Sequence, residues 1–174
     1  PQLYIDAIRG FAGIDPEQAE SFIRNRPTAD PINPNYINEF IEARAESDPL
    51  ATAEWIQQLP SSDPLYRTNN TEYLARAWTK TDSIAASAWL SEQPLGPERD
   101  AAIVGFAETI QNFEPVAAAT WANTISDGEQ RSRLLTSSVR TWAHTQPREA
   151  LEWVINSDLE PALQEQLARE IGVD

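Results

Sequence analysis

The stretch WTKTDSIAASAWL, from Trp78 to Leu90, contains the signals that decide the fold. It predicts the end of one helix, a one-residue corner at Asp82 and the start of a second helix. The Asp82 carboxylate can accept from the free N–H groups two and three residues further on, as a helix N-cap does. Small Ala86 and large Trp89 follow four and seven positions after the corner. This spacing puts both on one face of the second helix and therefore predicts a helical hairpin.

The same pattern occurs four more times along the chain. The corner positions, spaced 32 to 34 residues apart, are Asp15, Asp48, Asp82, Glu114 and Gln146. Proline follows in four of the five cases, where its missing N–H costs nothing at the first helical position. The positions seven after the corner are all aromatic: Phe22, Trp55, Trp89, Trp121 and Trp153. A lone hairpin cannot bury its apolar face, so the repeats must stack on one another.

The sequence thus predicts an all-α fold, an α-α superhelix (solenoid) of about five helical hairpins closed by a capping helix. The expected units of this single repeat domain, 1–174, are 1–30, 31–63, 64–96, 97–127 and 128–158, with a cap at 159–174. No segment alternates as a strand does, and we expect about eleven helices. Because the pattern begins and ends within a repeat, we expect the chain to be part of a longer one.

One repeat carries a resemblance to known sequences. The pattern W-x3-D-[PS]-x2-A-x2-W-L, followed by G-x2-R-D-x-A, is formed by Trp78, Asp82, Ser83, Ala86, Trp89, Leu90, Gly96, Arg99, Asp100 and Ala102. It resembles tandem repeats of large uncharacterised bacterial proteins of verrucomicrobial and planctomycete type. The period is also similar to that of tetratricopeptide repeats, but their W-x2-L-G-x2-Y signature is absent. The resemblance implies a helical-repeat fold and no particular activity, and the peptide-carboxylate clamp of the tetratricopeptide family is not transferred.

Composition limits the classes of partner. Thirteen Lys and Arg residues stand against 27 Asp and Glu, the formal net charge is −14, and no basic patch stands out. Nucleic acids and anionic membranes attract clustered cations, so we expect neither, whereas cationic partners or simple solubility fit. No apolar run approaches the ~18 residues of a membrane span. The absence of Cys and Met suits an exported protein and favours, weakly, the bacterial periplasm or cell envelope.

No pattern predicts catalysis, a metal site or a cofactor. His144 is the only histidine, and a zinc site needs about four ligands. Neither a G-x-S-x-G motif nor a calcium loop occurs. The tryptophan column at the seventh position indicates core packing rather than sugar stacking, because it falls on the apolar face. A facing pair of carboxylates, as glycosidases require, is neither indicated nor excluded.

Two charged columns are the candidate binding positions. Six before the corner, charges alternate: Arg9, Glu42, Arg76, Glu108 and Arg140. Successive first helices lie roughly 10 Å apart in a stack, so this column predicts either a ladder of ion pairs or a solvated face with chance alternation. Near the start of three first helices stand Arg67, Arg99 and Arg131. In one alternative, these guanidinium groups bind an acidic side chain of the protein itself or the carbonyls of the preceding loop. In the other, they bind acidic side chains or a C-terminal carboxylate of a partner.

The leading hypothesis is a non-catalytic scaffold that binds protein or peptide partners on a long curved surface. The alternative is a carbohydrate-binding or carbohydrate-active helical protein of the cell envelope, and a structural spacer is a third reading. An exposed Trp78 or Trp142 beside two facing carboxylates would favour the carbohydrate function. Burial of all six tryptophans, with a widest groove lined by polar residues of the first helices, would favour the scaffold.

Overall fold

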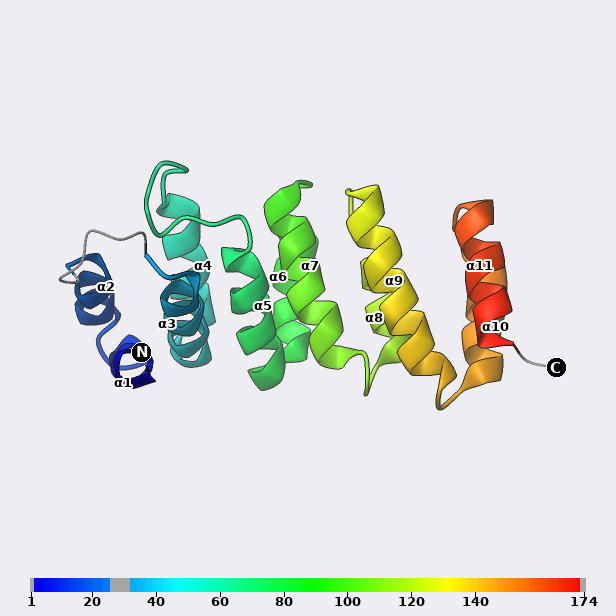
Figure 1. Cartoon of the computed structure of the whole chain (residues 1–174), viewed down its shortest axis with the longest axis horizontal. Coiled ribbons are helices and arrows are strands. Elements are labelled where there is room, and N and C mark those ends of the chain that lie inside the picture. The colour runs from blue at the N-terminus through cyan, green and yellow to red at the C-terminus, as the bar shows by residue number, and fades with distance from the viewer. Residues whose placement is uncertain (1, 26–31, 173–174) are drawn as a thin grey trace.

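The computed structural model describes residues 2–25 and 32–172, and every regular element in these ranges is a helix (Figure 1). The helices are α1 (Gln2–Ala12), α2 (Pro16–Arg24), α3 (Pro34–Ser47), α4 (Pro49–Gln58), α5 (Asn70–Thr81), α6 (Ser83–Glu92), α7 (Pro97–Ile110), α8 (Pro115–Ala122), α9 (Gly128–Ala143), α10 (Pro147–Asn156) and α11 (Pro161–Ile171). The predicted all-α fold is confirmed. The expected boundary between the first two repeats, at 30/31, lies outside the described residues.

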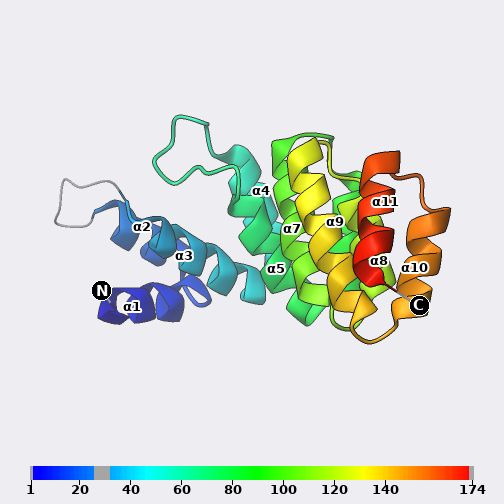
Figure 2. The same ribbon diagram turned by 45° about the vertical axis from the view of Figure 1, so that its right-hand side comes forward.

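The helices form a row that follows the order of the chain, with the two termini at opposite ends (Figure 1). Each odd-numbered helix contacts the next odd-numbered one, from α1 to α11. Each even-numbered helix packs against the odd-numbered helices before and after it rather than against its even-numbered neighbours. In Figure 2, α1 and α3 run across the view whereas α7 and α9 stand nearly upright, so the helix direction turns along the row. The odd layer is therefore the more closely packed of the two.

The predicted corners begin the even helices. Asp15, Asp48 and Asp82 each accept from the backbone N–H three residues further on, at 2.9 to 3.0 Å. These bonds satisfy amides that a helix start leaves without partners. The longer Glu114 and Gln146 make no such bond, and Gln146 instead accepts from the indole N–H of Trp142 at 2.8 Å. Three of the five corners are thus N-caps in the strict sense.

Each hairpin from α3 to α10 is held by a pair of aromatic rings, one from each of its helices. The pairs, with centroids 5.2 to 6.2 Å apart, are Phe40–Trp55, Trp78–Trp89, Phe106–Trp121 and Trp142–Trp153. The interpretation of the tryptophan column as packing is confirmed. Arg44 stands where Trp78 and Trp142 stand in their repeats, and its guanidinium lies 5.3 Å from the Trp55 ring centre. Burial lowers the pKa of Arg44, and the cation–π contact fills the place of a ring.

The helices α5 and α7 make the closest contact of the odd layer. A Cβ added at Gly105 would overlap the carbonyl oxygen of Glu72 and lie 2.9 Å from its carbon. Only glycine allows the two backbones to approach this closely. In the first turn of α7, the buried Asp100 accepts from the N–H groups of Ser126 and Asp127 at 2.9 and 3.1 Å. Asp100 therefore ties α7 to the loop that leads into α9.

Candidate functional site

The alternating column forms an ion-pair ladder across the middle of the odd layer. Arg76 on α5 lies between Glu42 on α3 and Glu108 on α7, with nitrogen–oxygen distances of 3.9 and 3.0 Å. Glu72, one turn earlier on α5, approaches the same guanidinium to 2.8 Å. Burial alone would lower the pKa of Arg76, but the hydrogen bonds that Arg76 donates to Glu72 and Glu108 outweigh it and raise the pKa. The predicted ladder is present at these three rungs.

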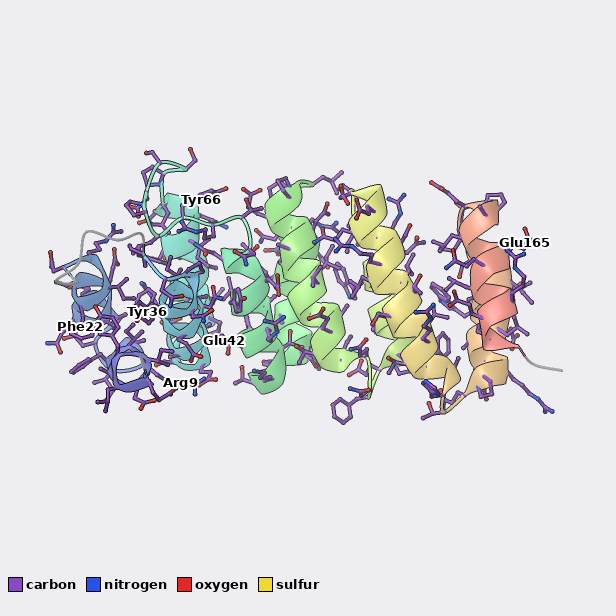
Figure 3. The ribbon with its side chains drawn as sticks, viewed as in Figure 1. Arg9, Phe22, Tyr36, Glu42, Tyr66 and Glu165 are labelled. Atoms are coloured by element: carbon purple, nitrogen blue, oxygen red, sulfur yellow. The ribbon has the colours of Figure 1, made fainter. Side chains whose placement is uncertain are left out.

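The two ends of the column pair differently. Arg9 binds Glu39 of α3 at 2.9 Å, so its partner lies one turn before Glu42, and Figure 3 shows Arg9 and Glu42 on adjacent helices. Arg140 binds Glu170 of α11 at 2.7 Å. Within the described residues Glu108 and Arg140 form no ion pair with each other. The ladder is interrupted between α7 and α9, whose own contact is slight because α9 packs mainly against α8.

The second column binds loop backbone. Arg67 donates to the carbonyls of Pro64, at 3.0 Å, and Tyr66. Arg131 donates to the carbonyl of Ile125 at 2.9 Å. All three carbonyls lie in loops: those bound by Arg67 belong to the loop before α5, where Arg67 itself lies, and that bound by Arg131 belongs to the loop before α9, which carries Arg131. The geometry corresponds to the alternative in which these arginines fix their own loops.

Arg99 makes the same kind of bond to a different loop. Its guanidinium donates to the Thr124 carbonyl at 3.2 Å and lies 5.9 Å from the ring centre of Trp121. It therefore connects the start of α7 to the end of α8. In the described structure the six arginine and glutamate positions predicted as binding residues link helices or loops. Recognition of a partner by any of them stays a prediction.

Trp78 and Trp142 do not provide the exposed stacking surface that would favour the carbohydrate alternative. Trp78 and Trp142 are 5% and 3% exposed. Trp89 is also buried, whereas the other three are half-buried: Trp55, Trp121 and Trp153. The observation that would favour the carbohydrate function at Trp78 or Trp142 is therefore absent. The complete burial of all six, which would favour the scaffold, is not observed either.

Two adjoining hollows lie on the even-numbered side of the row, around α8. The first, of about 500 Å³, lies between α8 and α10. Its lining residues are Val116, Thr120, Asn123, Trp142, Glu149, Glu152, Trp153, Asn156, Ser157 and Asp158. The second, of about 530 Å³, is lined by Phe113, Glu114, Pro115, Val116, Ala117, Thr120, Trp121 and Gln146. The two hollows share Val116 and Thr120 and are together called the α8 groove.

The α8 groove follows from the packing of the layers. The even helices do not pack closely on one another, and α8 has eight residues where α10 has ten. Apolar side chains remain exposed beside it: Phe113 is 85% exposed and Val116 48%. The floor is fixed, because the Trp142 indole is held by Gln146 and packs on the Trp153 ring. The groove thus combines exposed apolar side chains with a rigid aromatic base.

The charged residues of the α8 groove are all acidic. Among the residues that the structure describes, Glu114, Glu149, Glu152 and Asp158 line it, and no Lys, Arg or His does. Within the described part of the chain none of the four forms an ion pair, although several carboxylates of the odd layer do. All four are exposed. The groove therefore presents negative charge that the protein itself leaves unpaired.

Two other hollows are electrostatically balanced. One of about 470 Å³ between α4 and α6 contains Glu98 and Arg99, and the Tyr66 hydroxyl donates to Glu98 Oε1 at 2.6 Å. One of about 460 Å³ between α9 and α11 contains the Arg140–Glu170 pair. Over residues 2–25 and 32–172, no cluster of three or more potential metal ligands occurs, and no helix is long and apolar enough to cross a membrane.

Sequence reasoning did not find the α8 groove. Its apolar residues carry a signal: Phe113 directly precedes the Glu114 corner, and Val116 lies two positions after it, where other repeats have the apolar Leu50 and Ile84. Its acidic residues carry a weaker one, because Glu149 and Glu152 share a helix face three residues apart. The position of α8 relative to α10 could not be predicted from the sequence, because no local pattern determines it.

No protein-family model, curated protein or solved structure matches the chain. The class of protein is therefore defined by its own fold, an all-α row of helical hairpins stacked in chain order.

Proposed function

We propose that this protein is a helical-repeat scaffold of the solenoid type that binds a protein or peptide partner in the α8 groove, without catalysis. The observation that carries the proposal is the pair of adjoining hollows with exposed Phe113 and Val116 at their edge. Exposed apolar patches rimmed by polar groups are typical of interaction sites, and stacked hairpins present extended binding surfaces. The repeat pattern, which resembles tandem repeats of bacterial proteins, supports the same class.

The groove is suited to binding because it is already formed. Its base consists of rings held by neighbouring helices, with Trp142 and Trp153 centroids 6.2 Å apart. The Gln146 amide satisfies the indole N–H of Trp142. A partner that enters such a groove orders few side chains of the scaffold, so less binding free energy is lost to conformational entropy.

A carbohydrate ligand is the second candidate for the same groove. It is favoured by the half-buried Trp153, which lines the hollow together with Glu149 and Glu152. An aromatic ring beside carboxylates offers a stacking face and hydrogen-bond acceptors in one place. This reading predicts binding of oligosaccharides that competes with peptides for the groove.

The test is the binding of displayed peptide libraries to the protein and to two matched variants. Val116→Asp places a charge at the point that both hollows share, and Ile84→Asp places it at the same repeat position on α6, outside the groove. Both residues are exposed and lie in the first turn of a helix, where Asp is tolerated by the helix dipole. We expect peptides selected on the native protein to lose at least about tenfold in affinity for Val116→Asp and to keep it for Ile84→Asp.

Circular dichroism and urea unfolding check that both variants remain folded. Selected peptides that bind both variants equally would contradict the proposal, as would a library that gives no specific binder. An oligosaccharide panel, titrated against the native protein and Val116→Asp, decides between the two candidate ligands.

A further inference from the structure

We infer that the α8 groove selects a basic segment, a stretch of protein chain with apolar anchor side chains flanked by Lys or Arg. This inference rests on the proposed function and adds the chemistry of the partner. It is carried by the unpaired acidic lining of the groove together with the two apolar hollows that it surrounds.

The first step concerns charge. Glu149, Glu152 and Asp158 line one hollow and Glu114 the other, without any ion pair inside the described residues. Arg148 is the basic residue of α10 and does not line either hollow. Like charges gathered without a counterion raise the local negative potential, which attracts cations from solution and speeds their association.

The second step is the contrast with the odd layer. There Arg76 is shared by Glu42, Glu72 and Glu108, and Arg140 is bound to Glu170. A cationic partner would meet carboxylates that are already paired, and an acidic partner would meet guanidinium groups that are already occupied. Around α8 a cation gains new charge-assisted hydrogen bonds without breaking existing ones.

The third step concerns shape. Both hollows are broad, open depressions against which an apolar side chain can pack, and Phe113 and Val116 already expose apolar surface there. Burial of a Leu or Phe side chain contributes about 1.5 to 3 kcal/mol, more than an exposed ion pair does. Anchors therefore supply affinity and the carboxylates supply selectivity. Nucleic acid and anionic lipid are disfavoured because their phosphates would face the same carboxylates.

The experiment uses three synthetic peptides that differ in one feature at a time. The first is lysine-rich with two leucines, the second replaces each Lys by Glu, and the third replaces each Leu by Ser. Affinities are measured by isothermal titration calorimetry at low and at physiological salt. We expect the lysine–leucine peptide to bind at least about tenfold more tightly than either counterpart, with an affinity that falls as salt increases.

Two charge-matched variants locate the effect. Glu149→Gln/Glu152→Gln/Asp158→Asn removes three charges from the groove, and Glu17→Gln/Glu54→Gln/Glu92→Gln removes three from exposed positions of α2, α4 and α6. We expect the groove variant to lose about tenfold in affinity for the lysine–leucine peptide and the control variant to lose little.

The inference is overturned if the two variants lose affinity equally, because the peptide would then respond only to the total negative charge. It is also overturned if the glutamate peptide binds as tightly as the lysine peptide. In either case library peptides that depend on Val116 would leave the proposed groove in place. Library binders indifferent to Val116 would remove the groove itself, and that result belongs to the proposed function.

Discussion

Gly105 is the residue on which the closest helix contact depends. The backbone of α7 approaches α5 so nearly at this point that any Cβ would overlap the Glu72 carbonyl. Backbone atoms of a packed helix cannot move aside as the end of a flexible side chain can. The single hydrogen in place of a methyl group therefore sets the distance between the third and fourth hairpins.

We predict that Gly105→Ala destabilises the protein by roughly 1 to 3 kcal/mol, because the added methyl group forces α5 and α7 apart. Urea unfolding followed by circular dichroism measures the change. Gly10→Ala on α1 is the matched control, since no atom of the described residues lies within 4 Å of its added Cβ. There the same substitution should stabilise by about 0.5 to 1 kcal/mol through helix propensity. Equal effects at the two sites would disprove the close contact.

The Asp63 carboxylate forms a clamp between two segments that are far apart in the sequence. Its carboxylate accepts from both terminal nitrogens of Arg24 on α2, at 3.1 Å each, and from the N–H of Leu65 at 2.8 Å. Burial alone would raise the pKa of Asp63, but the hydrogen bonds from Arg24 and Leu65 outweigh it and lower the pKa. A carboxyl group with a lowered pKa in the folded state stabilises that state only while it is ionised.

The sign of the pH effect follows. The clamp contributes its stability at pH values above about 4, the unfolded pKa of an Asp, and loses it as the pH falls through the lower folded pKa. We predict that Asp63→Asn lowers the free energy of unfolding at pH 7 by about 1 kcal/mol relative to the native protein. The difference should shrink below about pH 4. Unfolding free energies across this range test it, and Asp158→Asn, at an exposed carboxylate without an ion pair, should show no such convergence.

At the scale of elements, α5 is the centre of the odd layer. It lies between α3 and α7 and carries Arg76, whose guanidinium contacts carboxylates from both neighbours. The ladder therefore connects three successive repeats through one side chain. It stops at α7, because α9 packs mainly on α8 and leaves Glu108 and Arg140 unpaired with each other.

A double-mutant cycle measures this link. Arg76→Met and Glu108→Gln should show a coupling free energy of about 0.5 to 1 kcal/mol that decreases as salt is added. The cycle Glu108→Gln with Arg140→Met is the control, and we predict a coupling near zero. A coupling of the same size in both cycles would mean that general charge effects, rather than a direct ion pair, connect the helices.

At the scale of the whole molecule, burial is concentrated in the middle of the row. Among the described residues, α5 and α7 each bury more than half of their positions, whereas α11 buries Leu167 alone and α1 only Ile8 and Ala12. In a stacked array each repeat is stabilised chiefly by its neighbours. The ends should therefore open more easily than the centre.

We predict that amide hydrogen exchange follows this gradient. Exchange should be slowest in α5 and α7 and fastest in α1 and α11, with opening free energies that differ by several kcal/mol, on the order of the global stability of a domain. Hydrogen–deuterium exchange read by mass spectrometry measures it. Uniform protection along the row would show instead that the molecule unfolds as one cooperative unit.

The whole molecule also separates its charges. The odd layer pairs many of its carboxylates with arginine, whereas the carboxylates of the α8 groove have no such partner in the described structure. Part of the net charge of −14 therefore stays unpaired around this groove. This local negative charge is what makes the groove a candidate for a cationic partner.

The sequence by itself determined the hairpins. The cap of Asp82 acts on an amide three residues away, and the Trp89 position is set by the period of one helix, so these features need no knowledge of distant chain. The alternation at Glu42, Arg76 and Glu108 was also visible, because a constant repeat length brings equivalent positions together in adjacent helices.

Only the tertiary structure decided how the repeats depart from one another. The clamp of Asp63 joins residues 39 positions apart, the approach at Gly105 depends on two helix axes, and Arg9 selects Glu39 over Glu42. The α8 groove depends on the distance left between α8 and α10. Local signals act within about one helical turn, whereas these features arise from small differences in the placement of whole helices. The repeat can therefore be predicted from the sequence, whereas the candidate site, which lies where the repeat is irregular, cannot.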